Sequence, residues 1–158
     1  MNADAVRVRL RRMRAADLEQ VMAIAASLKD ASQWPRAAYV SALNPDSMPR
    51  RIALVAEELG SGAVAGFAVA SFLAPQAELE TIAVLAGEQR RGIGRKLFFA
   101  LVDELRGAGA SEFLLEVRAS NQRALGFYRS LGWSEAGRRP RYYADPEEDA
   151  VLMSLGLG

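Results

Sequence analysis

The N-terminal part of the chain passes from a strand-like to a helix-like spacing of apolar residues. Valine and leucine alternate with arginine over residues 6–11, the period of two expected of a strand with one buried face. After Asp17, apolar residues recur at helical spacing over residues 18–28, and Pro35 suits the first turn of a second helix over residues 35–43. The pattern predicts a strand at or near a sheet edge, two helices and then a proline-rich loop.

The rest of the chain continues this alternation of element types. Residues 51–57 and 63–73 are two β-rich runs joined by the turn sequence LGSG, which predicts a hairpin, and residues 78–85 predict a further strand. From Ile93 the apolar period becomes helical and ends near Gly107. The segments that follow are a strand over 112–117, a helix over 121–131, a strand over 133–137, an irregular stretch over 138–149 and a closing strand over 150–155. This order predicts one α+β domain over residues 1–158, a mixed α/β three-layer arrangement with helices on both faces of one sheet.

Composition narrows the class of protein. Hydrophobic residues make up 51% of the 158 residues and charged residues 25%, while the formal net charge is only +1, so no global charge draws the chain to nucleic acid or membrane. Neither a spanning apolar run nor the apolar core of a secretion signal is present in the sequence. We therefore expect a soluble, cytoplasmic protein that binds neither nucleic acid nor membrane.

The chain contains no cysteine and no histidine. Disulfide frameworks, thiol nucleophiles, Cys/His metal sites and Ser-His-Asp triads are excluded together, because each needs one of those side chains. We expect no metal. Any proton transfer must use carboxylates, tyrosine, lysine, water or the chain termini.

One short motif, QRRGIG over residues 89–94, stands at the entrance of the long predicted helix. The first N–H groups of a helix lack intrahelical partners and carry the positive end of its dipole, so anions bind there. Gly92 and Gly94 would let the amides of residues 90–95 approach a pyrophosphate closely. The surrounding positive charge comes from Arg90, Arg91, Arg95 and Lys96. A Walker motif needs lysine and then serine or threonine after its last glycine, where this chain has Arg95 and Lys96, so nucleoside triphosphates are disfavoured. A dinucleotide motif needs a third small residue where this chain has Leu97, so NAD is disfavoured as well. A tight turn with a solvated basic rim is the alternative.

Longer stretches of the chain resemble the GNAT superfamily of N-acetyltransferases. These are TIAV (81–84), QRRGIGRKL, and LEVRASNQRALGFYRSLGW (115–133), and the glycine loop matches the acetyl-coenzyme A signature Q/R-x-x-G-x-G/A. The resemblance is greatest to the RimI type, the ribosomal-protein-alanine N-acetyltransferases, and also includes RRPRYY and EDAVLM. It implies a splayed mixed sheet of six or seven strands that holds acetyl-CoA in the splay. Departures from the group occur at Thr81 and in the short segment between Tyr143 and Glu148.

The resemblance also implies contacts for acetyl-CoA and a reaction in which an amine attacks it directly. The backbone of Ile82, Ala83 and Val84 would lie along the cofactor, with the N–H of Val84 as the oxyanion donor, and Asn121 would contact the pantetheine arm. The implied contacts on the loop are Gln89, Arg90, Arg91, Gly92, Ile93, Gly94, Arg95 and Lys96.

Three residues are candidates for proton transfer. Glu116 lies in an otherwise apolar strand, where its alternative reading is a half-exposed residue paired with Arg118; the resemblance favours it as the base, acting through water. Glu78 is the second-ranked base, and a solvated strand face is its alternative. Tyr128 has the spacing of an ordinary core residue, and the resemblance implies that it is the acid that protonates the coenzyme A thiolate.

The acceptor side has a weaker signal in the sequence. Tyr142 and Tyr143 could pack against the first residues of a peptide, Trp34 could form the opposite wall or belong to the core, and Glu80 shares the strand of Glu78. We expect a protein N-terminal α-amine as the acceptor, with the N-terminal alanine of a ribosomal protein leading, and a monomer or homodimer. A small-molecule amine, a lysine side chain, or a CoA-binding regulatory module without catalysis are the alternatives.

Overall fold

The computed structural model describes residues 7–89 and 92–158. Its strands form one seven-stranded sheet in the order β1-β2-β3-β4-β5-β7-β6. The strands are β1 (Val8–Arg12), β2 (Arg50–Glu58), β3 (Val64–Leu73), β4 (Gln76–Val84), β5 (Glu112–Arg118), β6 (Ser134–Tyr143) and β7 (Glu148–Gly156). The helices are α1 (Leu18–Ser27), α2 (Arg36–Leu43), α3 (Ile93–Gly107) and α4 (Gln122–Ser130), with short 3-10 turns at Ala15–Asp17 and Ala86–Glu88. The predicted α+β class and the edge position of the first strand are confirmed.

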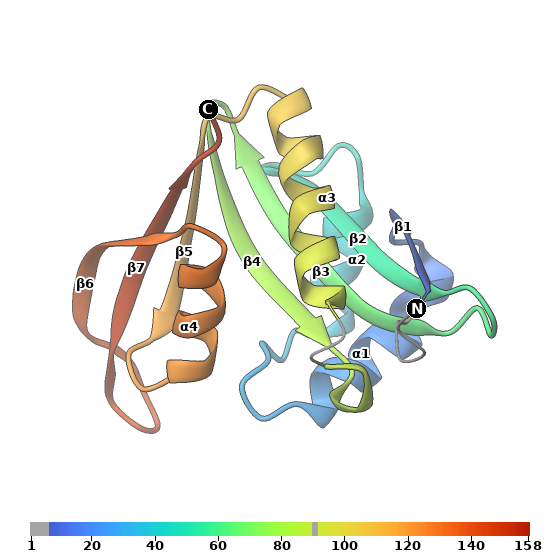
Figure 1. Ribbon diagram of the computed structural model, residues 1–158, viewed down its shortest axis with the longest axis horizontal. Coiled ribbons are helices and arrows are strands. Elements are labelled where there is room, and N and C mark those ends of the chain that lie inside the picture. Colours follow the sequence, from blue (N-terminus) through green and yellow to red (C-terminus); the bar gives the residue numbers. More distant parts are fainter. Residues whose placement is uncertain (1–6, 90–91) are drawn as a thin grey trace.

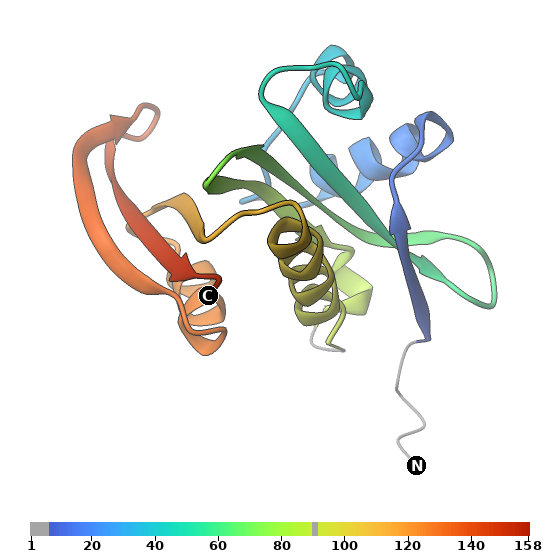
Figure 2. The ribbon, with the colours of Figure 1, turned by 90° about the horizontal axis from the view of Figure 1, so that it is seen from above.

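Helices cover both faces of the sheet. The first of two hydrophobic clusters includes the apolar faces of α3 and α4, and the second includes those of α1 and α2. In Figure 1 α3 lies in front of β2–β4 and α1 and α2 lie behind them, while α4 lies in front of the wing formed by β5, β7 and β6. Figure 2 shows the two wings of the sheet turning away from each other.

The prediction of an irregular segment over residues 138–149 is confirmed only for residues 144–147, which form a turn, and is wrong for 138–143 and 148–149, which lie in strands. β6 continues through Tyr143, and its pairing with β7 extends from Ser134↔Ser154 to Tyr143↔Glu148, with two irregularities in register. Almost every β6 residue is exposed, so no alternation of apolar residues marks the strand in the sequence. Backbone pairing with β7 is what orders it.

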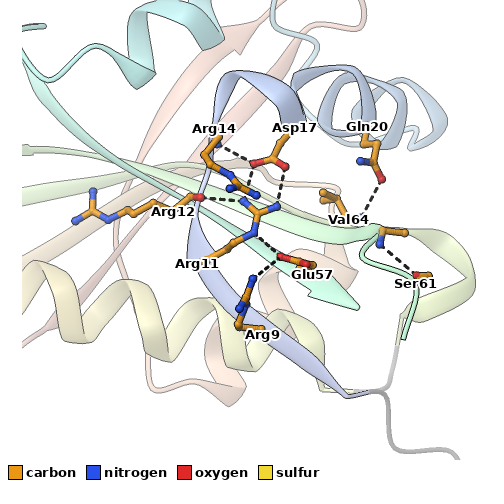
Figure 3. Close-up of polar contacts among 10 residues, drawn as sticks. Arg9, Arg11, Arg12, Arg14, Asp17, Gln20, Glu57, Ser61 and Val64 are labelled. Atoms are coloured by element: carbon orange, nitrogen blue, oxygen red, sulfur yellow. Dashed lines mark hydrogen bonds and ion pairs between the residues drawn. The ribbon is translucent and has the colours of Figure 1, made fainter. Parts of the chain in front are cut away.

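A buried ion pair joins the first strand to the start of α1 (Figure 3). The guanidinium of Arg11 donates to both carboxylate oxygens of Asp17 at 2.8 Å and to Glu57 at 2.5 Å, and the N–H of Arg14 donates to Asp17 at 2.8 Å. Asp17 is 3% exposed, so its carboxylate has little contact with water and needs the guanidinium of Arg11 to stabilise its charge. The contact fixes α1, and with it one side of the cleft described below.

Candidate active site

The sheet divides between β4 and β5. These parallel strands pair only over Gln76–Glu78 and Glu112–Leu114, and beyond that point β4 keeps β3 as its partner while β5 keeps β7. In β4 the register with β3 passes from Leu79 to Thr81, which leaves Glu80 as a bulge. A cleft of about 1010 Å³ occupies the division, and it is lined by β4, β5, α3, α4 and the segment after α1.

The N-terminus of α3 forms one end of this cleft. Gly92 is its N-cap with a left-handed φ of 82°, and as a glycine it has no side chain with which to cap the helix. Its carbonyl accepts the first intrahelical bond from the N–H of Lys96 at 3.1 Å, so the amides of Ile93, Gly94 and Arg95 precede the helical ladder. All three residues line the cleft. Free amides at the positive end of a 15-residue helix suit a phosphate group.

The basic rim expected around this loop is only partly described. Arg95 lines the cleft, whereas Lys96 is exposed and is not among the lining residues. Arg90 and Arg91 lie outside the described residues. The cradle seen here therefore consists mainly of backbone N–H groups, with Arg95 as the nearby charge.

Gly94 keeps the space between α3 and α4 open. A Cβ at this position would lie 3.3 Å from a ring carbon of Phe127 and 3.8 Å from a methyl group of Val84. Both of these residues line the cleft. A side chain at residue 94 would therefore project into the space beside the free amides.

The end of β4 offers backbone groups to the cleft. Leu85 donates to the carbonyl of Ala65 at 2.8 Å, and hydrogen-bonding directions alternate along an antiparallel strand, so the amides of Ile82 and Val84 point the other way, toward β5. The carbonyl of Val84 accepts from the side chain of Gln89 at 3.0 Å. Gln89 in turn accepts from the guanidinium of Arg123 on α4. These contacts link the two walls of the cleft.

Asn121, the N-cap of α4, and Tyr128, on the helix itself, both line the cleft. Asn121 caps the helix by accepting from the N–H of Ala124 at 3.1 Å. Tyr128 packs its ring against Trp133, with centroids 5.7 Å apart, and burial raises the pKa of its hydroxyl to about 12. Since burial disfavours the phenolate, the hydroxyl of Tyr128 keeps its proton at neutral pH.

Glu116 lies on the wall formed by β5, with its side chain 23% exposed. Its ion-pair partner is Arg139 at 3.6 Å, so the alternative reading in which Arg118 pairs with it is wrong. Arg118 instead contacts Glu148 at 3.4 Å. A hydrogen bond with the Glu116 carboxylate, together with its charge, raises the pKa of the Tyr142 hydroxyl.

Glu78 lies where β4 and β5 still pair, opposite Leu114, and it is not among the cleft-lining residues. Partial desolvation raises the pKa of its carboxyl, and the negative charges of Glu116 and Glu80 act in the same direction. Although solvent reaches Glu78 on one side, its charge is disfavoured by its neighbours. The geometry places Glu116, and not Glu78, on the cleft wall.

The four residues expected on the acceptor side separate into two groups. Tyr143 and Glu80 line the cleft, and Glu80 is held by the guanidinium of Arg51 at 2.8 Å. Trp34 is partly buried and packs on Tyr39 of α2 against the second hydrophobic cluster, with ring centroids 5.1 Å apart, and it is not among the cleft-lining residues. Tyr142 is half exposed and reaches Glu116 from outside the cleft lining.

Sequence reasoning missed several parts of the lining: the segment Leu28–Ser32 after α1, Arg118, Arg123 and Phe127. Arg118 carried a usable signal, because it shares a strand face with Glu116 and must therefore lie near it. The segment Leu28–Ser32 carried none, since no motif marks it and only the fold brings it opposite β5.

A split sheet whose cleft has an anion cradle at one end and a carboxylate and a tyrosine along its walls defines the acyl-CoA N-acyltransferase fold. The model of the acetyltransferase (GNAT) family matches residues 17–133, and the chain belongs to that family. It is an N-acetyltransferase whose acetyl donor is acetyl-CoA.

Within this family, the chain is similar to enzymes from two bacteria. The [ribosomal protein bS18]-alanine N-acetyltransferase of Escherichia coli K12 is 44% identical over 99 residues, which cover 61% of this chain and 67% of that protein. A putative enzyme of the same name from Bacillus subtilis is 31% identical over 144 residues, 91% of this chain and 92% of that one. The crystal structure of the ribosomal-protein-S18-alanine N-acetyltransferase from E. coli superposes with a TM-score of 0.81 at 32% identity, covering 96% of this chain and 95% of that one.

Within residues 7–89 and 92–158, no helix is long and apolar enough to cross a membrane, and no cluster of acidic side chains has the arrangement of a metal site.

Proposed function

We propose that this protein transfers the acetyl group of acetyl-CoA to the N-terminal α-amine of a protein, with the N-terminal alanine of a ribosomal protein as the leading acceptor. The observation that carries the proposal is the position of Glu116 on a cleft wall that continues from the α3 amide cradle. The bS18-alanine acetyltransferases that resemble the chain support the choice of acceptor.

The chemistry of an α-amine matches the modest base that the cleft provides. An α-amino group has a pKa of about 7.7 to 8.0 and is roughly a tenth neutral at pH 7, whereas a lysine, with a pKa near 10.4, is neutral in fewer than about one molecule in a thousand. Glu116 is a partly buried carboxylate held by one arginine, and from the cleft wall it can accept the proton of such an amine through water.

The residues that would hold the donor are those of the α3 cradle, the end of β4, Arg95 and Asn121. When bound, acetyl-CoA supplies the thioester carbonyl that the amine attacks. We assign Lys96 to the outer rim of this site, where it adds positive charge, and we keep Arg90 and Arg91 as cofactor contacts expected from the motif alone.

Three groups of the chain have separate roles in the reaction: one accepts a proton, one stabilises the developing negative charge and one donates a proton. The carboxylate of Glu116 accepts the proton of the amine through a water molecule, and Glu78 is the second-ranked base. The N–H of Val84 donates to the thioester carbonyl oxygen as negative charge develops on it. The hydroxyl of Tyr128 gives its proton to the departing thiolate. Without cysteine, direct attack by the amine is the simplest route.

The acceptor peptide would enter between Tyr143 on one side and the segment Leu28–Ser32 on the other, with Glu80 and Tyr142 at the edges. We treat residues 1–158 as one acetyltransferase domain that acts as a monomer or homodimer. A ribosomal acceptor would place it in the cytoplasm.

Mass spectrometry of synthetic peptides tests this proposal. Peptides that begin with Ala, Ser or Met, and an N-terminally blocked peptide with an internal lysine, are incubated with the purified protein and acetyl-CoA. We expect one acetyl group on the Ala-starting peptide and none on the blocked peptide. Reaction of the blocked peptide or of a polyamine alone would replace the proposed acceptor with a lysine or a small amine. Binding of acetyl-CoA without any turnover would favour a regulatory module.

A further inference from the structure

The side chain of Arg118, at the end of β5, holds the turn between β6 and β7, residues 144–147. The guanidinium of Arg118 donates to the carbonyl oxygens of Pro146 at 3.2 Å and Ala144 at 3.3 Å, and it contacts the carboxylate of Glu148 at 3.4 Å. Glu148 also accepts from the N–H of Ser120 at 2.5 Å, directly after β5. Figure 1 shows the turn beside the end of β5, on the wing that faces β4 across the division of the sheet.

The turn has features that make this attachment necessary. Asp145 takes a left-handed φ of 49°, which residues other than glycine seldom adopt. Ala144, Asp145, Pro146 and Glu147 are all exposed, so no apolar burial holds the turn in place. Its position depends on polar contacts, and Arg118 makes more of these to it than any other described side chain.

The same guanidinium lies over the ring of Tyr143, with its central carbon 4.4 Å from the ring centroid. Tyr143 lines the cleft, and its ring meets that of Tyr142 edge to face, with centroids 5.0 Å apart. The Glu116 carboxylate lies close enough to Tyr142 to raise the pKa of its hydroxyl. A line of contacts therefore runs from Arg118 through both tyrosines to the candidate base, which lies two residues earlier on the same strand.

We propose that Arg118 is a positioning residue for the acceptor: it fixes the turn after β6 and holds Tyr143 as the cleft wall at a set distance from Glu116. The inference rests on the proposed function, since it treats this wall as the acceptor side of the cleft. A planar guanidinium suits the task because it can stack on the ring and use several N–H groups at once, which a lysine cannot do.

The first test replaces Arg118 with methionine, which keeps an apolar stem and removes the guanidinium. Arg138→Met is the matched control, because Arg138 lies on the same hairpin, is exposed, and pairs only locally with Glu135 at 2.9 Å. We expect Arg118→Met to raise KM for an Ala-starting peptide by about 10- to 100-fold, as a displaced binding group does, with kcat changed less. The dissociation constant of acetyl-CoA, measured by calorimetry, should equal that of the wild type.

Amide hydrogen exchange supplies a second readout that does not depend on the acceptor. Arg118→Met should speed exchange at Ser120 and over residues 141–149 while leaving α3 unchanged. If the wild type acetylates no N-terminal peptide but this exchange pattern appears, the proposed function fails and the attachment of the turn stands.

Three results would overturn the proposal: unchanged exchange over the turn, an unchanged KM for the peptide, or weakened binding of acetyl-CoA, which would assign Arg118 to the donor site. Should Arg118→Met not fold, Arg118→Lys serves instead. Lysine keeps the positive charge but lacks the planar guanidinium that stacks on Tyr143. We therefore expect Arg118→Lys to raise KM as well, by less than Arg118→Met does.

Discussion

Replacing Gly94 with valine should separate donor binding from folding. Gly94 is the second residue of α3, and a Cβ there would already lie 3.3 Å from the Phe127 ring and 3.8 Å from Val84. The two further methyl groups of valine must enter the space beside the free amides of the helix. The change therefore obstructs the place where we expect a phosphate while leaving the helix itself able to form.

The two consequences differ in size. For folding, valine gains about 0.3 kcal/mol of helix propensity over glycine, and displacing one ring costs about 1 kcal/mol. The net loss of about 0.7 kcal/mol should lower the melting temperature by about 1 to 3 °C. For binding, the loss of one charge-assisted hydrogen bond removes about 1.5 to 3 kcal/mol. That loss corresponds to a Kd for acetyl-CoA raised about 10- to 150-fold.

Calorimetric titration with acetyl-CoA and thermal unfolding followed by circular dichroism measure the two quantities. Gly87→Val is the matched control, since nothing lies within 4 Å of a Cβ at that exposed position. A folded Gly94→Val protein whose Kd stays within about threefold of the wild type would refute the role given to the α3 amides. A melting temperature lowered by about 10 °C or more would refute the packing described between α3 and α4.

Further predictions concern the proposed proton transfers and the Asp17 ion pair. Glu116→Gln should lower kcat by about 100-fold or more in steady-state assays, with Glu78→Gln having a smaller effect; the reverse order would make Glu78 the base. Tyr128→Phe should lower kcat by about 100-fold without weakening acetyl-CoA binding. Because burial raises the pKa of Tyr128 to about 12, the wild-type kcat should show no alkaline decline below about pH 11, and a decline near pH 10 would contradict its burial. Asp17→Asn should lower the free energy of unfolding by about 2 to 4 kcal/mol at pH 7 in urea titrations. The hydrogen bond from Arg11 lowers the pKa of Asp17 below its unfolded value, so this advantage is present above about pH 3.9 and is lost as the pH falls through the folded pKa; a difference independent of pH would contradict the ion pair.

The elements with a strong local signal were predictable from the sequence. The glycines on either side of Ile93 and the helical period that follows predict the cradle, because both the close backbone approach and the helix start are local properties. β6 was not predictable beyond residue 137. Its sequence is rich in arginine and contains Pro140, and its order comes from pairing with β7 and not from a buried face.

The walls of the site were harder to predict because they depend on how the two wings of the sheet diverge. Glu116 and Arg118 share a strand face, yet residues two apart on a strand are separated by nearly 7 Å, and partners from β6 and β7 approach each of them more closely. An aromatic residue such as Trp34 fits a core or a cleft equally well in sequence, and only the packing of α1 against α2 decides between them. Contacts between residues far apart in the chain leave no regular spacing in the sequence from which they could be predicted.

The most direct test of the central claim is the position of the acetyl group on one peptide that offers both kinds of amine. A peptide with N-terminal alanine and an internal lysine is incubated with the protein and acetyl-CoA, and tandem mass spectrometry locates the added group. We predict a single acetyl group on the α-amine, lost with Glu116→Gln. An acetyl group on the lysine would contradict the proposed acceptor, and so would no reaction with any free α-amine while acetyl-CoA binds.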